Sequence, residues 1–151
     1  MRQDGHDEVW EGIYHVVPPA HAHHGMIQCE IAEVLSPLVN RRGLRPSTAF
    51  NLGDGKSSYR VPDFGVHETA PDLLYVPTAV MVGEILSPDD ETYDKFDYYA
   101  RHGVAEIIVV EPAKRAIMAY GLQDDGTYAP ADHIACAGLT CADLQAQISW
   151  P

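Results

Sequence analysis

The fold of this 151-residue chain is constrained most by an almost continuous apolar run, Ala79–Leu86, that contains one carboxylate. A short apolar run without helical spacing is typical of a strand that is covered on both faces of a sheet. Burying the carboxylate, Glu84, is costly unless it is paired, hydrogen-bonded or bound to a metal ion. The run therefore predicts a central strand with one side chain that needs a partner.

The elements expected on either side of this run indicate a mixed α/β domain. Helical spacing of apolar residues predicts helices over 25–40, 88–102 and 142–148. Strands are expected over 12–17, 47–52, 59–67, 79–86, 106–110, 115–122 and 128–136. This order favours a mixed central β-sheet flanked by helices. No linker, repeat or low-complexity tract divides the chain, so we expect one domain over residues 1–151.

Local signals refine three of these elements. Pro37 should kink or end the first helix. Ser87 and Pro88 have the residue types of a helix N-cap and first turn, and Gly103 should end the helix that follows. The polar turn 53–56 predicts a hairpin between the strands at 47–52 and 59–67.

Composition limits the partners and the compartment. A formal charge of −12 argues against tight, non-specific binding to nucleic acid or to an anionic membrane. The sequence has neither an apolar run of membrane-spanning length nor the pattern of a signal peptide, so a cytoplasmic location is expected. Cys29, Cys136 and Cys141 are odd in number and form no CxxC pair, which favours buried, unpaired thiols.

A second carboxylate joins Glu84 as a candidate metal ligand. Asp63 follows Pro62 in a neighbouring predicted strand, and two carboxylates on adjacent strands could converge on one hard divalent cation. The alternative is that both residues lie at strand ends and face water. Lys95 could approach the same pocket from the following helix, or it could be a solvated partner of Glu91 four residues earlier.

A histidine-based metal site is a competing interpretation. His21, His23 and His24 lie in a loop after two prolines and could bind a transition metal, with Glu84 or His67 as a further ligand. A His-x-His before strands is also seen in cupin-like sites. The long helical patterns and the absence of a later Glu/His ligand series weigh against that fold.

Several motifs together carry a family resemblance, although each one alone would be weak. They are Val61-Pro62-Asp63, the run Val80–Pro88, the spaced set Glu91, Lys95, Tyr99 and Gly103-Val104, and the strand Ile107–Val110 ending in Glu111-Pro112. This ensemble resembles the Uma-two family of endonucleases, which belongs to the PD-(D/E)XK restriction-endonuclease-like superfamily. The resemblance implies a nuclease-like core over about residues 14–122, with a C-terminal strand and helix extension over 123–151.

The resemblance also implies a site. Asp63, Glu84 and the backbone carbonyl of Ile85 would bind Mg²⁺ or Mn²⁺, and Lys95 would join the two acids as the catalytic set. The superfamily lysine normally stands two residues after the second acid, where this chain has Leu86, and in this family it lies on the following helix. The remaining pocket residues implied are His24, Glu30, Glu33, Glu91 and Tyr99.

The expected function is metal-dependent hydrolysis of phosphodiester bonds in DNA. The alternative is a catalytically inactive protein that keeps the nuclease fold for binding or as a scaffold, because six acids and one base lie between Glu84 and Asp97. DNA binding is expected to be weak or metal-dependent, through a local stretch in which five bases face one acid, Asp54. These bases are Arg41, Arg42, Arg45, Lys56 and Arg60. The resemblance to restriction-like enzymes also suggests a homodimer.

Overall fold

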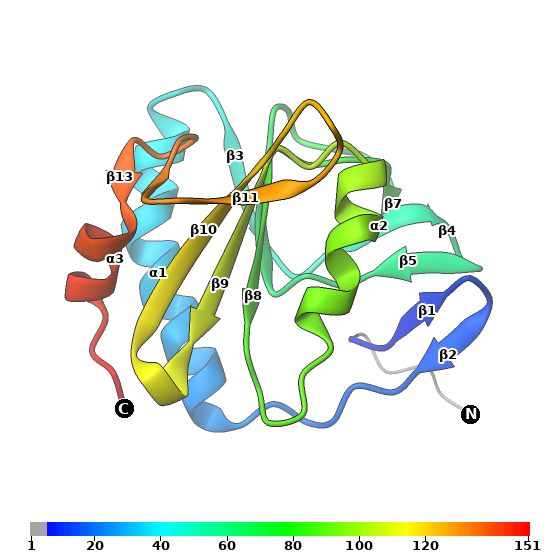
Figure 1. The fold of residues 1–151 in the computed structure, drawn as a ribbon, viewed down its shortest axis with the longest axis horizontal. Helices are drawn as coiled ribbons and strands as arrows, with labels where there is room; N and C mark the ends of the chain where they lie inside the picture. The colour runs from blue at the N-terminus through cyan, green and yellow to red at the C-terminus, as the bar shows by residue number, and fades with distance from the viewer. Residues whose placement is uncertain (1–5) are drawn as a thin grey trace.

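The computed structural model describes residues 6–151 and is built around a six-stranded mixed sheet (Figure 1). The strand order is β11-β10-β9-β8-β6-β3. Their bounds are β3 Arg45–Thr48, β6 Phe64–His67, β8 Met81–Ile85, β9 Glu106–Glu111, β10 Ala116–Leu122 and β11 Tyr128–Ala131. Strands β8 and β9 are parallel, whereas the other neighbours are antiparallel. The expected mixed central sheet is confirmed.

Helices cover both faces of this sheet (Figure 1). Helix α1 (Ala22–Asn40) and helix α3 (Cys141–Gln147) pack on one face, and a 3₁₀ turn, η1 (Thr92–Lys95), leads into α2 (Phe96–Arg101) on the other. Alternate residues of β9 supply both cores, because successive side chains of a strand point to opposite faces. Every residue of β8 is buried, as its apolar sequence predicts.

A smaller, five-stranded sheet lies beside α2 and contains the N-terminal hairpin (Figure 1). Its order is β2-β1-β5-β4-β7, with bounds β1 Glu8–Trp10, β2 Ile13–His15, β4 Asn51–Gly55, β5 Ser58–Arg60 and β7 Tyr75–Val76. A 3₁₀ turn, η2 (Pro112–Lys114), joins β9 to β10, and a two-stranded ladder of β12 (His133–Ile134) and β13 (Leu139–Thr140) precedes α3. The N-terminal hairpin lies close to η1 and α2, since Glu8 contacts Lys95 and Glu11 contacts Arg101.

The predicted hairpin between 47–52 and 59–67 is confirmed in its antiparallel pairing, but it is divided between the two sheets. Each predicted strand is two strands, so that β4 pairs with β5 in the small sheet while β3 pairs with β6 in the large one. Pro62 lies where the chain passes from one sheet to the other, and it has no backbone N–H to offer to a ladder. The hairpin itself therefore closes only around Lys56 and Ser57.

Two other boundaries differ from the sequence expectation. The second helix does not begin at Ser87 and Pro88, because the Asp90 carboxylate accepts the N–H groups of Ser87 and Thr92 (2.9 and 2.7 Å) and holds this segment as a loop. Gly103 does end α2, with a φ of +68°. The predicted strand 128–136 is divided between β11 and β12, which belong to different sheets.

The first helix and the cysteines each depart from expectation in one respect. Helix α1 ends at Asn40 as expected and continues through Pro37, but it begins at Ala22, three residues before the predicted start. All three cysteines are free thiols, but Cys29 is exposed, whereas Cys136 and Cys141 are buried as expected. Among residues 6–151, no helix is both long and apolar enough to cross a membrane.

Gly83 gives a test of how tightly the central strand is packed. A Cβ at this position would lie 1.9 Å from Cζ of Phe64 on β6, so Gly83→Ala should lower the free energy of unfolding by about 2 kcal/mol, within the usual range for overpacking. Gly25→Ala in α1 is the control, because no atom lies within 4 Å of its Cβ and alanine favours helix by about 0.5–1 kcal/mol. Urea unfolding of both variants measures the difference, and equal stability of the two would refute this packing.

The buried His67 should make stability depend on pH. Burial lowers the pKa of His67 below its ordinary value of 6.5, so below that pH the unfolded chain binds a proton that the folded chain does not. Stability should therefore fall as the pH decreases from about 7 through 6.5, and less steeply in His67→Gln. Urea unfolding at several pH values measures this slope. His133→Gln, at an exposed position, should keep the wild-type slope.

Candidate metal centre

Asp63 is fixed beside the end of the central strand by both its backbone and its side chain. It immediately precedes β6, and its N–H donates to the carbonyl of Gly83 on β8 (3.0 Å). Its Oδ2 accepts the N–H of Ile85 (2.7 Å), and the Gln28 side chain of α1 donates to its backbone carbonyl. The antiparallel pairing of β6 with β8 thus places Asp63 against the segment that contains Glu84.

Glu84 points to the α2 face of the sheet, where two donors meet it. Its side chain is buried, and its Oε1 accepts hydrogen bonds from Lys95 Nζ (3.1 Å) and from the Tyr99 hydroxyl. Lys95 ends η1 and Tyr99 lies four residues later in α2, so both side chains lie on one face of this helical segment. Among the described residues, no hydrogen bond is made to the other oxygen of Glu84, Oε2.

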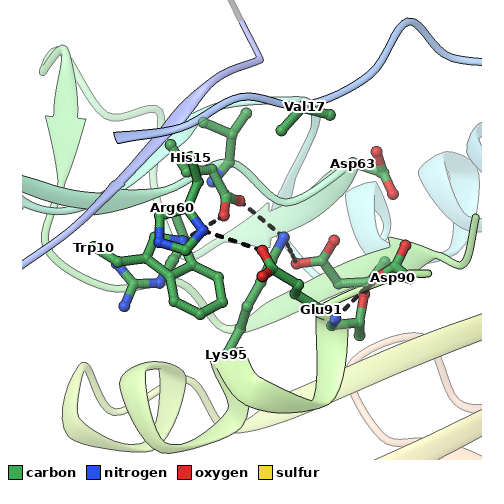
Figure 2. Close-up of polar contacts among 12 residues, drawn as sticks. Trp10, His15, Val17, Arg60, Asp63, Asp90, Glu91 and Lys95 are labelled. Atoms are coloured by element: carbon green, nitrogen blue, oxygen red, sulfur yellow. Dashed lines mark hydrogen bonds and ion pairs between the residues drawn. The ribbon is translucent and has the colours of Figure 1, made fainter. Parts of the chain in front are cut away.

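Lys95 is buried in an ion-pair cluster rather than solvated. Its Nζ lies 3.1 Å from Glu84 Oε1 and 2.8 Å from Glu8 Oε1 (Figure 2). The alternative interpretation of Lys95 as an exposed partner of Glu91 is wrong, because the Glu91 carboxylate lies 3.1 Å from His15 instead. The packing of α2 against β8 and β1 decides this, and spacing along one helix could not.

Glu8 is a site residue that sequence reasoning missed. It is 2% exposed on β1, and it lies 87 residues from the lysine that it contacts. A glutamate within the apolar strand Glu8–Trp10 was the signal available, but a three-residue strand near the terminus is too short to show a reliable pattern. The cluster therefore holds two buried carboxylates around one ammonium, with Asp63 close by.

Burial and the neighbouring charges shift the pKa values of Glu84 and Lys95. Burial raises the pKa of Glu84 to about 8, and the charges of Asp63 and Glu8 add to the rise while Lys95 and Tyr99 oppose it. Burial by itself would lower the pKa of Lys95, but its ion pairs with Glu84 and Glu8 outweigh this and raise that pKa above its ordinary value. Both groups therefore favour their protonated forms, which is the behaviour of an electronegative pocket that attracts cations.

His24 lies at the rim of this pocket, on the first turns of α1. Its Nε2 lies 3.2 Å from Asp63 Oδ1, and this hydrogen bond raises the pKa of His24 despite partial burial. The Asp63 carboxylate is thus oriented by a backbone N–H on one oxygen and an imidazole on the other.

The other carboxylates implied as pocket residues are not brought into this cluster. Glu30 accepts the N–H of Ser149 near the C-terminus (2.6 Å), and Glu33 is exposed on α1. Glu91 lies on the exposed loop after β8, where its contact with His15 joins this loop to the N-terminal hairpin (Figure 2). Of the additional pocket residues, His24 and Tyr99 contact the candidate ligands.

The basic residues do not form one surface. Arg60 is buried, with its guanidinium 4.3 Å from the ring centre of Trp10 and 3.8 Å from that of Tyr98. Arg41, Arg42 and Arg45 lie where α1 ends and β3 begins, whereas Lys56 lies in the β4–β5 turn on the other side of the molecule (Figure 1). The expectation of a single basic face is wrong, because the chain passes between two sheets within this stretch.

The histidine-based alternative gains no support. His21 caps α1 and its Nδ1 accepts the N–H of His23, while His67 is at the far end of β6 and contacts Ser47 (2.9 Å). Within residues 6–151, no group of three or more His, Cys, Asp or Glu side chains is arranged to hold a metal ion. A metal site among these residues would therefore combine fewer side chains with other oxygen donors.

The donor set at Asp63 and Glu84 meets that condition. Mg²⁺ is commonly bound by one or two carboxylates, with several waters and substrate phosphates as its remaining ligands. The N–H of Ile85 points to Asp63, and its carbonyl points the same way because both groups of a strand residue face the same neighbour. The charge of Asp63 also acts on Glu84, so the two carboxylates lie near each other, and with this carbonyl they would suit a magnesium-type site rather than a closed structural one.

Comparison with known proteins agrees with this architecture. Residues 1–137 match the family described as "Uma2: Putative restriction endonuclease". A crystal structure from Anabaena variabilis, described as a "putative nuclease belonging to DUF820", has 21% sequence identity and a TM-score of 0.74 and covers 93% of this chain and 90% of its own. This likeness shows a shared fold. The search of curated proteins found no match. Since the family match spans most of the sequence, the resemblance seen in the motifs is confirmed, and the chain belongs to the Uma2 family.

Proposed function

We propose that this protein is a metal-dependent endonuclease that hydrolyses phosphodiester bonds in DNA. The observation that carries the proposal is a pair of contacts at the end of β8: Lys95 donates to Glu84 (3.1 Å), and Asp63 accepts the N–H of Ile85, the next residue (2.7 Å). The family match supports a nuclease. Two carboxylates beside a buried ammonium form the combination that phosphodiester hydrolysis needs, because negative charge must be neutralised while a water attacks phosphorus.

The residues that would hold the metal are Asp63, Glu84 and the carbonyl of Ile85, with Mg²⁺ or Mn²⁺ as the ion. A divalent ion there would neutralise charge on the scissile phosphate and lower the pKa of a coordinated water. Glu84 would contribute Oε2, since Oε1 already accepts from Lys95 and Tyr99. Asp63 would be held in place by the Ile85 N–H and by His24.

Lys95 would serve as a hydrogen-bond donor and a positive charge rather than as a base. The raised pKa of Lys95 keeps it an ammonium at neutral pH. An ammonium next to Glu84 can orient the attacking water or stabilise charge on a phosphate oxygen. Tyr99 would fix Glu84 from the other side through its hydroxyl.

Nucleic-acid binding through this surface would be weak without metal. The loop at 87–91, which follows Glu84 in the chain, is exposed and carries Asp89, Asp90 and Glu91, all of which repel phosphate. Exposed arginines at the end of α1 are available for contacts away from the site, and a homodimer would double their number. A duplex would therefore depend on bound cations to approach the carboxylates.

Replacement of the three central residues tests the proposal. Asp63→Asn, Glu84→Gln and Lys95→Met should each lower the Mg²⁺-dependent cleavage rate of plasmid or single-stranded DNA by about 100-fold or more, since several kcal/mol of charge stabilisation is lost. Glu68→Gln, at the other end of β6, is the matched control and should cleave at the wild-type rate. Circular dichroism confirms that each variant is folded. Failure of the wild-type protein to cleave with Mg²⁺ or Mn²⁺ would refute the nuclease.

Calorimetry separates an active nuclease from an inactive scaffold. Titration with MgCl₂ or MnCl₂ should show saturable binding that Asp63→Asn abolishes and Glu68→Gln preserves, because Asp63 is a proposed ligand and Glu68 is not. Addition of EDTA should remove both the bound metal and the cleavage. Absence of metal binding to the wild-type protein would favour the non-catalytic scaffold, which has no need of a convergent oxygen site.

A further inference from the structure

The buried carboxylate of Glu8 has no part in the catalytic set described so far, yet it makes the shorter of the two contacts to Lys95. Glu8 Oε1 lies 2.8 Å from Lys95 Nζ, against 3.1 Å for Glu84 Oε1. Its side chain is 3% exposed, so water gives it little solvation. A carboxylate that is buried this deeply persists only when its partners satisfy it.

The partners of Glu8 show that it is an anchor and not a metal ligand. Its Oε1 also accepts the N–H of Val61 (2.8 Å), and its Oε2 accepts the indole N–H of Trp10 (2.7 Å). Both oxygens are therefore engaged by protein donors, in contrast to Glu84, whose Oε2 receives no hydrogen bond from the described residues. Oε1 of Glu8 already accepts two bonds and Oε2 one, so a metal ion on Glu8 would compete with these protein donors.

Two fixed acceptors determine where the lysine can donate. An ammonium has three N–H donors in a tetrahedral arrangement, and Lys95 directs two of them to Glu8 and Glu84. The direction of the third donor is then set by geometry. With Glu84 as the sole acceptor, the ammonium could rotate and point that donor in many directions.

Glu8 also offsets an electrostatic repulsion that a bound metal ion would introduce. A divalent cation on Glu84 and the ammonium of Lys95 would share one carboxylate and repel each other at short range. A second carboxylate on the far side of the ammonium attracts it and offsets that repulsion. We propose that Glu8 is a positioning residue that holds the Lys95 ammonium beside Glu84 when a metal ion is bound. This inference rests on the proposed function.

The N-terminal hairpin makes this anchor rigid. Strand β1 pairs with β5 through Val9 and Tyr59, and Trp10 stacks between Arg60 and His15, each 4.3 Å away (Figure 2). Trp10 thus donates to Glu8, and its own position is fixed by packing against Arg60 and His15. The hairpin is part of the support of the site although it contributes none of the proposed metal ligands.

The decisive experiment compares Glu8→Gln with Glu11→Gln, an exposed glutamate on the same hairpin. For Glu8→Gln we expect kcat for Mg²⁺-dependent cleavage to fall about 10- to 100-fold, as for other residues that orient a catalytic group. KM and the calorimetric Kd for Mg²⁺ should stay within about twofold of wild type, because Glu8 is not a ligand. Glu11→Gln should match wild type in all three. An unchanged kcat in Glu8→Gln, or a loss of Mg²⁺ affinity equal to the loss of rate, would overturn the inference.

A double-mutant cycle shows whether Glu8 acts through the lysine. In a Lys95→Met background, Glu8→Gln should change the residual rate by less than about twofold, since the group that it positions is gone. Equal fold-losses with and without Lys95 would show an independent effect and overturn the inference. Should Glu8→Gln unfold, Trp10→Phe removes one donor to Glu8 and should lower kcat with unchanged Mg²⁺ affinity; wild-type kcat would count against the proposal.

A readout that needs no catalysis separates this inference from the proposed function. The chain has only three lysines, Lys56, Lys95 and Lys114, so the ¹⁵N-labelled ammonium signals can be assigned by substitution. Lys95 should give a slowly exchanging signal in the wild-type protein, because its N–H groups are buried and bonded, and this protection should be lost in Glu8→Gln. Protection that survives in Glu8→Gln overturns the inference whatever the activity. A wild-type protein that shows this protection but cleaves nothing overturns the proposed function instead.

Discussion

The ion pairs of the buried Lys95 connect the parts of this structure that form the candidate site. The ammonium joins Glu84 of the large sheet to Glu8 of the small sheet, and the lysine itself belongs to the helical segment between them. Taking these charges out of water has a large desolvation cost, which close contacts and the added bonds from Tyr99, Trp10 and Val61 offset. The relative placement of the two sheets is therefore coupled to the geometry of the site.

The location of the site follows from the alternation of side chains along β8. Met81 and Ile85 contribute to the core under α1, and Val82 contributes to the core under α2, so Glu84 must also face α2. Asp63 reaches the same end of the sheet because β6 runs antiparallel to β8 and begins one residue after it. A cavity of about 470 Å³ lies at the opposite end of these strands, is lined partly by His67 and Ala79, and includes none of the candidate ligands. The candidate ligands lie at the other end of these strands, where Glu84 is buried and Asp63 is partly exposed.

The negative net charge of the protein opposes the nucleic-acid binding that the proposed function requires. A net charge of −12 and an acidic loop beside the site oppose binding of a phosphate backbone. The five bases between residues 41 and 60 do not offset this negative charge as one surface. Arg60 is buried between aromatic rings, and the exposed bases lie at separate ends of the fold. In the proposed function, bound divalent cations would be the main means by which a phosphate approaches the carboxylates.

The sequence by itself determined the central strand, the mixed sheet, the end of α2 at Gly103 and the candidacy of Asp63 and Glu84. These depend on local patterns, namely an uninterrupted apolar run, a glycine with positive φ and acids placed within strands. The tertiary structure alone decided the partners of Lys95, the contacts of Glu8, the separation of the bases and the division of the hairpin at 45–67 between two sheets. Each of these depends on contacts between residues far apart in the chain, as in the 87 residues between Glu8 and Lys95. Packing of the two sheets against α2 sets such contacts, and no periodicity in the sequence records them.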